Sequence, residues 1–196
     1  QHLSALIHTH SLLPTTPSPQ TDLLLGLTRL NFLRALNTNI DVLGYTPENM
    51  LHDDAKSFFS MIGPRCPGTE DRESVLPVAL QPTLIQRTVP HHPWLDLIPV
   101  AQMRDNLILM EDVMDDGLLC RDMCGNRVRD GDLRGGAGTG ETGVIVWRDP
   151  WDPEGWEVTE TFVRRWGWVV RGCWGLFEST NAWRGRRGEG ALFRGV

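Results

Sequence analysis

The chain has 196 residues, a formal net charge of −6 and 40% hydrophobic residues. This length suits one domain that buries roughly 70% of its extended surface, and it is too short for two comfortable domains. The charge is uneven, because residues 161–196 carry 7 arginines and 2 glutamates while the preceding part is acidic overall. An acidic body disfavours a nucleic-acid surface there and leaves one open only near the C-terminal end.

Cysteine usage and hydropathy limit the cellular compartments in which this chain is expected. The four cysteines form no paired framework and the chain has no Asn-x-Ser/Thr acceptor, which favours a reducing compartment over secretion. The longest apolar run, residues 23–36, is interrupted by Arg29, Asn31 and Arg34 and is too polar to span a membrane. The first twenty residues lack a basic start and a cleavage-like site, so we expect no signal peptide and no membrane association.

The first predicted element is a helix over residues 22–44. Asp22 is placed to cap its start and Gly44 its end. Between them apolar residues recur at steps of three or four, which predicts a core-facing stripe of Leu23, Leu27, Leu30, Leu33, Leu36, Ile40 and Leu43. The heptad positions that follow Leu23 and Leu30 fall on Asn37 and Gly44, which argues against a leucine zipper.

The middle of the chain is rich in proline. Thr46 and Pro47 can start a second short helix with Met50, Leu51, Ala55, Phe58 and Phe59 facing inward. Residues 62–77 interrupt the periodicity and are predicted to form a surface loop. Five prolines then fall between Pro77 and Pro99, which predicts extended or turning backbone draped over the helices.

Two further helices and one strand are predicted next. Val100, Met103, Leu107 and Met110 mark an amphipathic helix, and Leu118, Leu119 and Met123 mark a shorter one that ends at Gly125. Residues 125–142 are rich in glycine and predict a flexible insert. Residues 143–147 favour a short strand, and the spacing from Trp156 to about Gly172 favours a helix.

These elements predict a mainly α protein, a single irregular helical domain with long proline-rich connections and at most a short strand near residues 143–148. The expected organisation is a flexible N-terminal segment at 1–21, a helical domain at 22–184 and a frayed basic tail at 185–196.

Two motifs have simple interpretations. Residues 138–143 match GxGxxG, but the match precedes the predicted strand instead of following one, so a low-complexity loop explains it better than nucleotide binding. Cys120 and Cys124 share one helical face, yet no other candidate ligand has finger-like spacing. A buried pair of small side chains is therefore favoured over a zinc site, and we expect no metal.

His91 and His92 raise the question of a general base, with Asp96 near enough in sequence to orient one ring. No nucleophile motif accompanies them. A structural turn that buries Trp94 and hydrogen-bonds both imidazoles is therefore the favoured interpretation.

Seven of the eight tryptophans lie between Trp147 and Trp183, beside several arginines. Such a cluster can stack bases of single-stranded nucleic acid, but its helical spacing favours an aromatic core with cation–π contacts. Within DPWDPEGWEV, residues 149–158, the Asp-Pro pairs predict turns, and Asp152 or a residue just after it is expected to cap the helix that follows.

Three blocks carry a family resemblance: LTRLNFLRALNTNIDVLG, LQPTLIQRTVPHHPWLDLIPVAQMRDNLI, and the segment GVIVWRDPWDPEGWEV with its continuation to residue 189. Together they resemble the fungal domain of unknown function that lies C-terminal to basic leucine-zipper regions in predicted transcription factors. Arg148 stands where that family is expected to have glycine. The resemblance implies a nuclear regulatory context and supplies no catalytic residues. It also implies contact with DNA only indirectly, through a basic leucine-zipper segment that this sequence lacks.

We therefore hypothesise a non-enzymatic regulatory domain, without a cofactor, that binds a protein partner or a small effector and is located in the nucleus or otherwise the cytoplasm. The candidate ligand-facing residues are His91, His92, Trp94, Asp96, Arg104, Asp149, Trp151, Asp152 and Trp156. One alternative is a small-molecule hydrolase or isomerase that uses His91 or His92 with a carboxylate. Another is weak nucleic-acid binding through the C-terminal arginines. An imidazole that reaches Asp149 or Asp152 in an open pocket favours the enzyme, whereas buried rings bonded to backbone favour a structural role.

Overall fold

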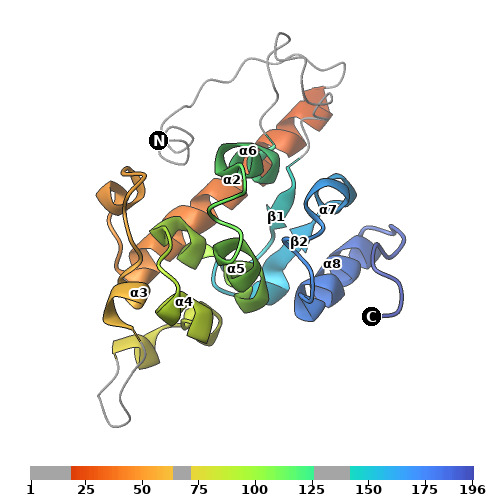
Figure 1. The fold of residues 1–196 in the computed structure, drawn as a ribbon. Coiled ribbons are helices and arrows are strands. Elements are labelled where there is room, and N and C mark those ends of the chain that lie inside the picture. The colour runs from red at the N-terminus through yellow and green to blue at the C-terminus, as the bar shows by residue number, and fades with distance from the viewer. Residues whose placement is uncertain (1–18, 64–71, 126–141) are drawn as a thin grey trace.

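The computed structural model describes residues 19–63, 72–125 and 142–196, and this part of the chain is mainly helical (Figure 1). It contains seven α-helices, several one-turn 3₁₀ segments and one two-stranded antiparallel sheet, which confirms the predicted fold class. Most of the predicted N-terminal segment and of the glycine-rich insert, with the GxGxxG match, lies outside the described residues. Among the described helices none is long and apolar enough to cross a bilayer.

Helix α2 (Pro19–Leu43) runs along one side of the whole body (Figure 1). It ends as predicted, because Gly44 takes a φ of 75°, the left-handed conformation that glycine adopts without strain. It begins at Pro19, three residues before the predicted start at Asp22. The central part of the helix packs against β1, η4 and α6.

The predicted stripe on α2 is only half correct. The buried face consists of Phe32, Ala35, Leu36, Ile40 and Leu43. Leu23, Leu27 and Leu30 are instead 65%, 47% and 38% exposed. No described element covers these three side chains, so a correct helical period does not here imply burial.

The remaining α-helices are short: α3 (Phe58–Ile62), α4 (Leu84–Thr88), α5 (Ala101–Ile108), α6 (Asp116–Cys124), α7 (Glu160–Trp166) and α8 (Trp174–Arg186). Helices α5 and α6 were predicted. Asp115 caps α6 by accepting from the backbone N–H of Leu118, and Gly125 ends it with a φ of 72°. Met110 lies beyond the end of α5 and is 40% exposed, so its predicted inward position is wrong.

The strands β1 (Val144–Val146) and β2 (Trp156–Val158) pair antiparallel, with Ile145 opposite Glu157. The sheet lies between α2, which contacts β1, and α8, which contacts β2 (Figure 1). Strand β1 was predicted. The continuous helix predicted from Trp156 to Gly172 is wrong, because Trp156–Val158 pairs with strand β1 and Thr159 then caps a separate helix, α7.

Two other predictions for the middle of the chain are wrong in detail. The helix expected after Thr46 is a single 3₁₀ turn, η1 (Pro47–Met50), and α3 begins only after Ser57 caps it. The stretch from Pro77 to Pro99 is not mainly extended, since it contains η3 (Val78–Leu80), α4 and η4 (Pro93–Leu97). Each proline stands at or just before the start of a short helical turn or follows its end, so prolines here delimit turns instead of preventing them. The predicted surface loop at 62–77 contains η2 (Arg72–Val75).

The C-terminal end is not frayed. Asn181 of α8 accepts hydrogen bonds from the backbone N–H groups of Leu192 and Phe193 and donates to the carbonyl of Phe193. The Phe193 ring stacks on Phe177 with centroids 4.0 Å apart. Arg187 reaches back to β2, where its Nη1 and Nη2 donate to the two oxygens of Glu157 at 2.8 and 2.5 Å. These contacts fold the segment onto α8.

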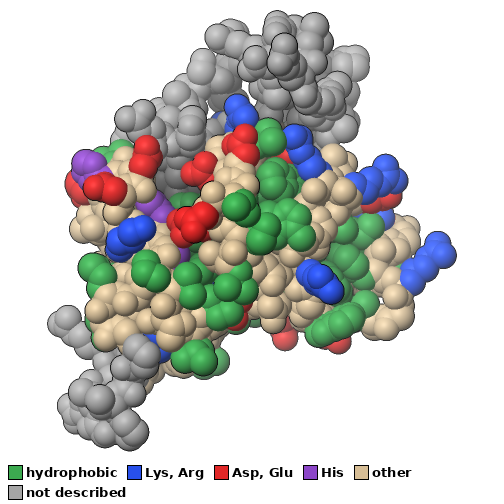
Figure 2. Space-filling view, viewed as in Figure 1, with side chains coloured by type: hydrophobic (Ala, Val, Ile, Leu, Met, Phe, Trp, Pro, Cys, Tyr) green, Lys and Arg blue, Asp and Glu red, His purple; other side chains and the backbone are tan. Residues whose placement is uncertain are grey.

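Charged side chains are unevenly distributed over one face of the molecule. Acidic side chains gather over α6 and the turn before it, and arginines gather over α7 and α8 (Figure 2). Hydrophobic side chains occupy the surface between the two regions.

Candidate functional site

Asp96 is the centre of a buried polar cluster. It lies in η4 and is 0% exposed. Its Oδ2 accepts hydrogen bonds from the Tyr45 hydroxyl at 2.5 Å and the Ser57 hydroxyl at 2.7 Å. Its Oδ1 accepts from Gln86 Nε2 at 2.6 Å and faces His91 Nε2 at 2.8 Å. Four donors occupy the acceptor sites of one carboxylate, so Asp96 is fully satisfied without a ligand.

His91 is held on both ring nitrogens. Its Nδ1 lies 2.7 Å from the carbonyl oxygen of Val89, which can only accept, and its Nε2 faces the Asp96 carboxylate. Both nitrogens must therefore donate, which is the arrangement of an imidazolium. Burial lowers the pKa of His91, but the hydrogen bond and charge of Asp96 outweigh it, and the pKa is raised above its ordinary value. Burial, followed by the Asp96 charge, raises the pKa of Tyr45, which stays a donor.

Arg104 of α5 extends this cluster and is also 0% exposed. Its Nε donates to Gln86 Oε1 at 2.8 Å, so Gln86 bridges Arg104 and Asp96. Its terminal nitrogens donate to three backbone carbonyls, those of Ala79, Ile98 and Gln81, at 2.7 to 2.9 Å. Burial lowers the pKa of Arg104 to about 10, so the side chain remains charged at neutral pH. The cluster fastens α3, α4, η4 and α5 to one another.

Three members of this cluster, His91, Asp96 and Arg104, were predicted from the sequence as candidate ligand-facing residues. The other three, Tyr45, Ser57 and Gln86, were not predicted. One available signal was the capping box of α4, in which Thr83 caps the backbone of Gln86 and the Gln86 side chain accepts from the backbone N–H of Thr83. That signal places Gln86 at a helix start but does not connect it with Asp96. Tyr45 and Ser57 carry no local signal for this role.

The cluster faces protein on every side. His91, Asp96 and Arg104 are inaccessible, and Trp94 and Trp156 are buried. His92 is half-buried, accepts from the backbone N–H of Trp94 and donates through Nε2 to the carbonyl of His52. Both histidines thus bond to backbone near them, and among the contacts of the described residues neither reaches Asp149 or Asp152. This geometry favours a structural role for both rings.

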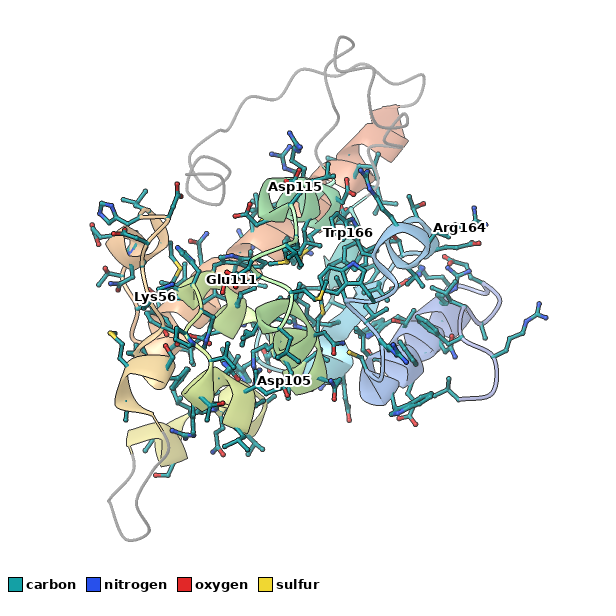
Figure 3. All side chains as sticks on the ribbon, viewed as in Figure 1. Lys56, Asp105, Glu111, Asp115, Arg164 and Trp166 are labelled. Carbon is teal, nitrogen blue, oxygen red and sulfur yellow. The ribbon has the colours of Figure 1, made fainter. Side chains whose placement is uncertain are left out.

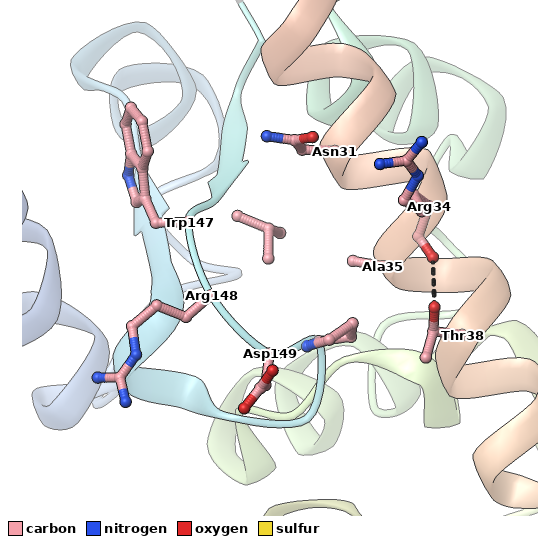
Figure 4. A pocket seen from close by; sticks show the side chains of 9 residues that line it. Asn31, Arg34, Ala35, Thr38, Trp147, Arg148 and Asp149 are labelled. Carbon is pink, nitrogen blue, oxygen red and sulfur yellow. Dashed lines mark hydrogen bonds between the residues drawn. The ribbon is translucent and has the colours of Figure 1, made fainter.

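An open groove lies elsewhere, between α2 and the turn that follows β1. It has a volume of about 490 Å³. Its lining residues are Asn31, Arg34, Ala35, Thr38, Val146, Trp147, Arg148, Asp149 and Pro150. In Figure 4 the Asn31 side chain reaches from α2 toward the turn, whereas Trp147 and Arg148 point to the other side of the strand. Side chains of α2 therefore form one wall, and mainly backbone of residues 146–150 forms the other.

The turn wall is held rigidly. The carbonyl oxygen of Pro150 accepts hydrogen bonds from Asn39 Nδ2 at 3.1 Å and from Trp156 Nε1 at 3.0 Å. The Trp156 ring packs edge-on against Phe32 with centroids 5.9 Å apart. Asp152 accepts from the backbone N–H of Glu154 and so caps η5 (Pro153–Gly155), not the longer helix that was predicted. A fixed wall favours a preformed binding surface over an induced one.

The groove carries unpaired charge. Arg34 is exposed and makes no ion pair with a described residue, and Asp149 likewise has no described side-chain partner. Arg148 is engaged, because it pairs with Asp152 at 3.3 Å. One wall thus offers a guanidinium and an amide, and the other offers a carboxylate. Of the predicted site residues, Asp149 lines the groove, while Trp151 and Asp152 lie half-buried in the turn next to it.

The tryptophan and arginine cluster is largely paired within itself. Trp147 and Trp183 stack with centroids 5.4 Å apart, and Arg187 and Arg186 lie over their rings. Trp147 Nε1 donates to Glu157, which also binds Arg187 and is 2% exposed. In addition, Arg164, Arg165 and Arg184 form ion pairs with acidic side chains. These contacts favour the interpretation of the cluster as aromatic core.

Three cysteines are buried thiols. Cys120, Cys124 and Cys173 are free, and burial raises the pKa of Cys124 and of Cys173 to about 12. Within residues 19–63, 72–125 and 142–196 no group of three His, Cys, Asp or Glu side chains is arranged to hold a metal ion. Cys66 lies outside the described residues.

The fold and the groove define a mainly helical domain with a sealed polar cluster and a preformed open surface. The family described as Domain of unknown function (DUF3425) matches residues 63–176, and the chain belongs to this family. No curated protein and no solved structure matches the chain.

Proposed function

We propose that this chain is a non-enzymatic regulatory domain that binds a small effector in the groove between α2 and residues 146–150. The observation that carries the proposal is the combination of two facing walls. One is the rigid turn, and the other is α2, where the Arg34 guanidinium forms no ion pair with a described acidic residue. A guanidinium favours carboxylate or phosphate ligands, and Asp149 on the other wall favours a donor on the same molecule. The effector is therefore a small polar molecule with at least one anionic group.

The alternative of a hydrolase or isomerase has weaker support. Its base would be His91 or His92, yet His91 has no exposed surface and both of its nitrogens are engaged. A general base must reach the proton that it removes, directly or through one water. The cluster would have to open before a substrate could reach it, whereas the groove is already open.

The wider context rests on the resemblance of the sequence blocks to a domain that follows basic leucine-zipper regions in fungal transcription factors. We extend the proposal accordingly: the domain serves such a transcription factor, acts in the nucleus and contacts DNA only through a separate segment. Two observations test this. The complete open reading frame should encode a basic region upstream of residue 1, and the full-length protein with a fluorescent tag should accumulate in the nucleus.

The effector proposal is tested by calorimetry and tryptophan fluorescence with a defined panel of probes: inorganic phosphate, phosphate esters, mono- and dicarboxylates, and amino acids. We expect at least one probe class to bind the wild-type chain, and Arg34→Ala to weaken that binding at least tenfold. Arg194→Ala is the matched control, because this arginine is exposed and lies at the far end of the chain. Binding that Arg34→Ala leaves unchanged, or no binding across the panel, would remove the proposal.

A further inference from the structure

A line of side chains along the outer side of α5 leaves apolar surface uncovered. Gln102, Asn106, Leu109 and Val113 follow one another at steps of four, three and four, so they share one side of the helix and of the turn after it. Leu109 is 60% exposed and Val113 is 75% exposed. Met110 beside them is 40% exposed. Three neighbouring exposed apolar side chains form a patch that suits a contact surface.

Trp174 follows a segment that packs beside the start of this line. It is the first residue of α8 and is 64% exposed. The segment before it is fastened to α5, since Asn106 Nδ2 donates to the carbonyls of Val169 and Arg171 at 2.9 and 2.8 Å. Gly172 packs beside Gln102, the residue at the start of the line. The distance along α5 from Gln102 to Leu109 is about 10 Å, so both ends fit within one interface.

The two ends of this surface carry opposite charges. Four of the six residues from Glu111 to Asp116 are acidic, and of these Asp112 is exposed and has no described partner. Arg171, at the tryptophan end, is also exposed and makes no ion pair with a described residue. In Figure 3 Glu111 and Asp115 lie on one side of the face, with Lys56 beyond Glu111, and Arg164 lies on the other side. Apolar side chains lie between the two regions (Figure 2).

We propose that this surface binds a second copy of the same chain in a two-fold symmetric dimer. In such a dimer the same patch of both copies forms the interface. Every contact between a residue of one copy and a different residue of the other therefore occurs twice, once in each direction. Antiparallel α5 helices, with the symmetry axis near Asn106, bring Trp174 of one copy against Leu109 and Val113 of the other. The same rotation places Arg171 beside Asp112, twice per dimer. An aromatic anchor with charged pairs around it is the usual anatomy of a specific interface.

A second uncovered apolar surface, at Leu23, Leu27 and Leu30 of α2, is the rival interface. Nothing in the described residues around it selects a partner. The α5 surface does favour a particular partner, a second copy of the chain. Its acidic residues and Arg171 lie at opposite ends, so they face each other when the second copy is rotated by 180°. The inference does not depend on the effector groove, because the groove lies on the α2 side of the two-stranded sheet and α8 lies on the other side.

Sedimentation of the chain at low salt tests the dimer. We expect a concentration-dependent dimer that weakens as salt screens the charged pairs. Asp112→Arg and Arg171→Asp each place like charges together at both contacts, and each variant alone should weaken the dimer at least tenfold. An equal mixture of the two variants should restore dimerisation. In the mixed pair the arginine introduced at position 112 faces the aspartate introduced at position 171, and the unchanged Arg171 faces the unchanged Asp112.

Controls separate this surface from its rival and from misfolding. Both charge variants should keep the wild-type circular dichroism spectrum and melting temperature, since each side chain is exposed. Trp174→Ala should also weaken the dimer, and Leu27→Arg should leave it intact. A chain that stays monomeric at every concentration overturns the proposal. So does a dimer that responds to Leu27→Arg but not to the charge variants, or a mixture that fails to restore dimerisation.

Discussion

Two segments of the chain start in the same way and end in opposite environments. In η4 the ring of His92 accepts from the backbone N–H of Trp94 and Pro93 opens the turn. In η5 the carboxylate of Asp152 accepts from the backbone N–H of Glu154 and Pro153 opens the turn. All five residues of η4 are buried, whereas only Gly155 is buried in η5.

The difference comes from the neighbours and not from the local sequence. Segment η4 packs against α2, α5 and η1, so Asp96 within it gathers four hydrogen-bond donors and no solvent. Segment η5 packs against α8 and leaves its other side open, so Asp152 pairs with the half-exposed Arg148. A capping residue followed by proline thus predicts a turn, while access to that turn depends on distant parts of the chain.

The largest difference between the two segments should appear when one arginine is removed from each. Arg104→Met leaves Gln86 and three backbone carbonyls without their charged donor, and it should cost about 3–5 kcal/mol of unfolding free energy. Arg148→Met should change stability by less than about 0.5 kcal/mol, because its ion pairs are exposed. Urea unfolding measures both. If Arg104→Met does not fold, Arg104→Lys should fold with an intermediate loss. Equal losses for Arg104→Met and Arg148→Met would contradict the contrast.

A smaller effect is expected at the buried residue of η5. A Cβ at Gly155 would lie 2.9 Å from Arg148 Cβ and 3.2 Å from the Arg148 backbone nitrogen. Gly155→Ala must therefore shift the turn and should cost about 1–3 kcal/mol. Gly26→Ala is the matched control, since nothing lies within 4 Å there, and it should stabilise α2 by roughly 0.5–1 kcal/mol. Thermal unfolding of both variants checks the sign as well as the size.

The smallest effect is a difference in pH dependence between adjacent histidines. The pKa of His91 is raised, so its contribution to stability is complete below about pH 6.5 and is lost as pH rises through its folded-state pKa. Burial lowers the pKa of His92 in spite of the His52 carbonyl and Glu111, so its contribution is lost as pH falls below about 6.5. The stability difference between wild type and His91→Gln should therefore shrink with rising pH, and that for His92→Gln with falling pH. Urea unfolding from about pH 5 to about pH 8.5 measures both, and parallel trends would contradict the assignment.

The sequence was sufficient where a segment and its termination signals lie together. The helix that ends at Gly44, the helix that ends at Gly125, the strand near residue 145 and the turn-forming role of Asp152 were all predicted. The two helix ends and the Asp152 turn depend on contacts within a few residues, and the strand, which pairs with β2, was predicted from its β-branched apolar residues. The mainly α class followed from these local elements.

The sequence was insufficient where distant residues decide. Trp156–Val158 is followed by apolar residues at helical steps, but pairing with β1 makes it a strand. Asp96 collects its donors from residues 5 to 51 positions away, which no spacing rule connects. The groove is equally non-local, because Arg34 and Asp149 come from segments that only the folded chain brings together. The sequence therefore named Asp149 as a candidate and missed Arg34.

One hydrogen-bonded junction has a practical consequence. The backbone N–H of Gly143 lies 3.0 Å from the carbonyl of Asp122 and 3.1 Å from that of Met123, and Thr142 shares a hydroxyl hydrogen bond with Thr28 of α2. The last residues of α6 and the residues just before β1 thus lie side by side, and hydrogen bonds hold both. Because these two ends lie close together, a short linker in place of residues 126–141, or a fluorescent reporter inserted between the ends, should disturb neither the groove nor the outer side of α5.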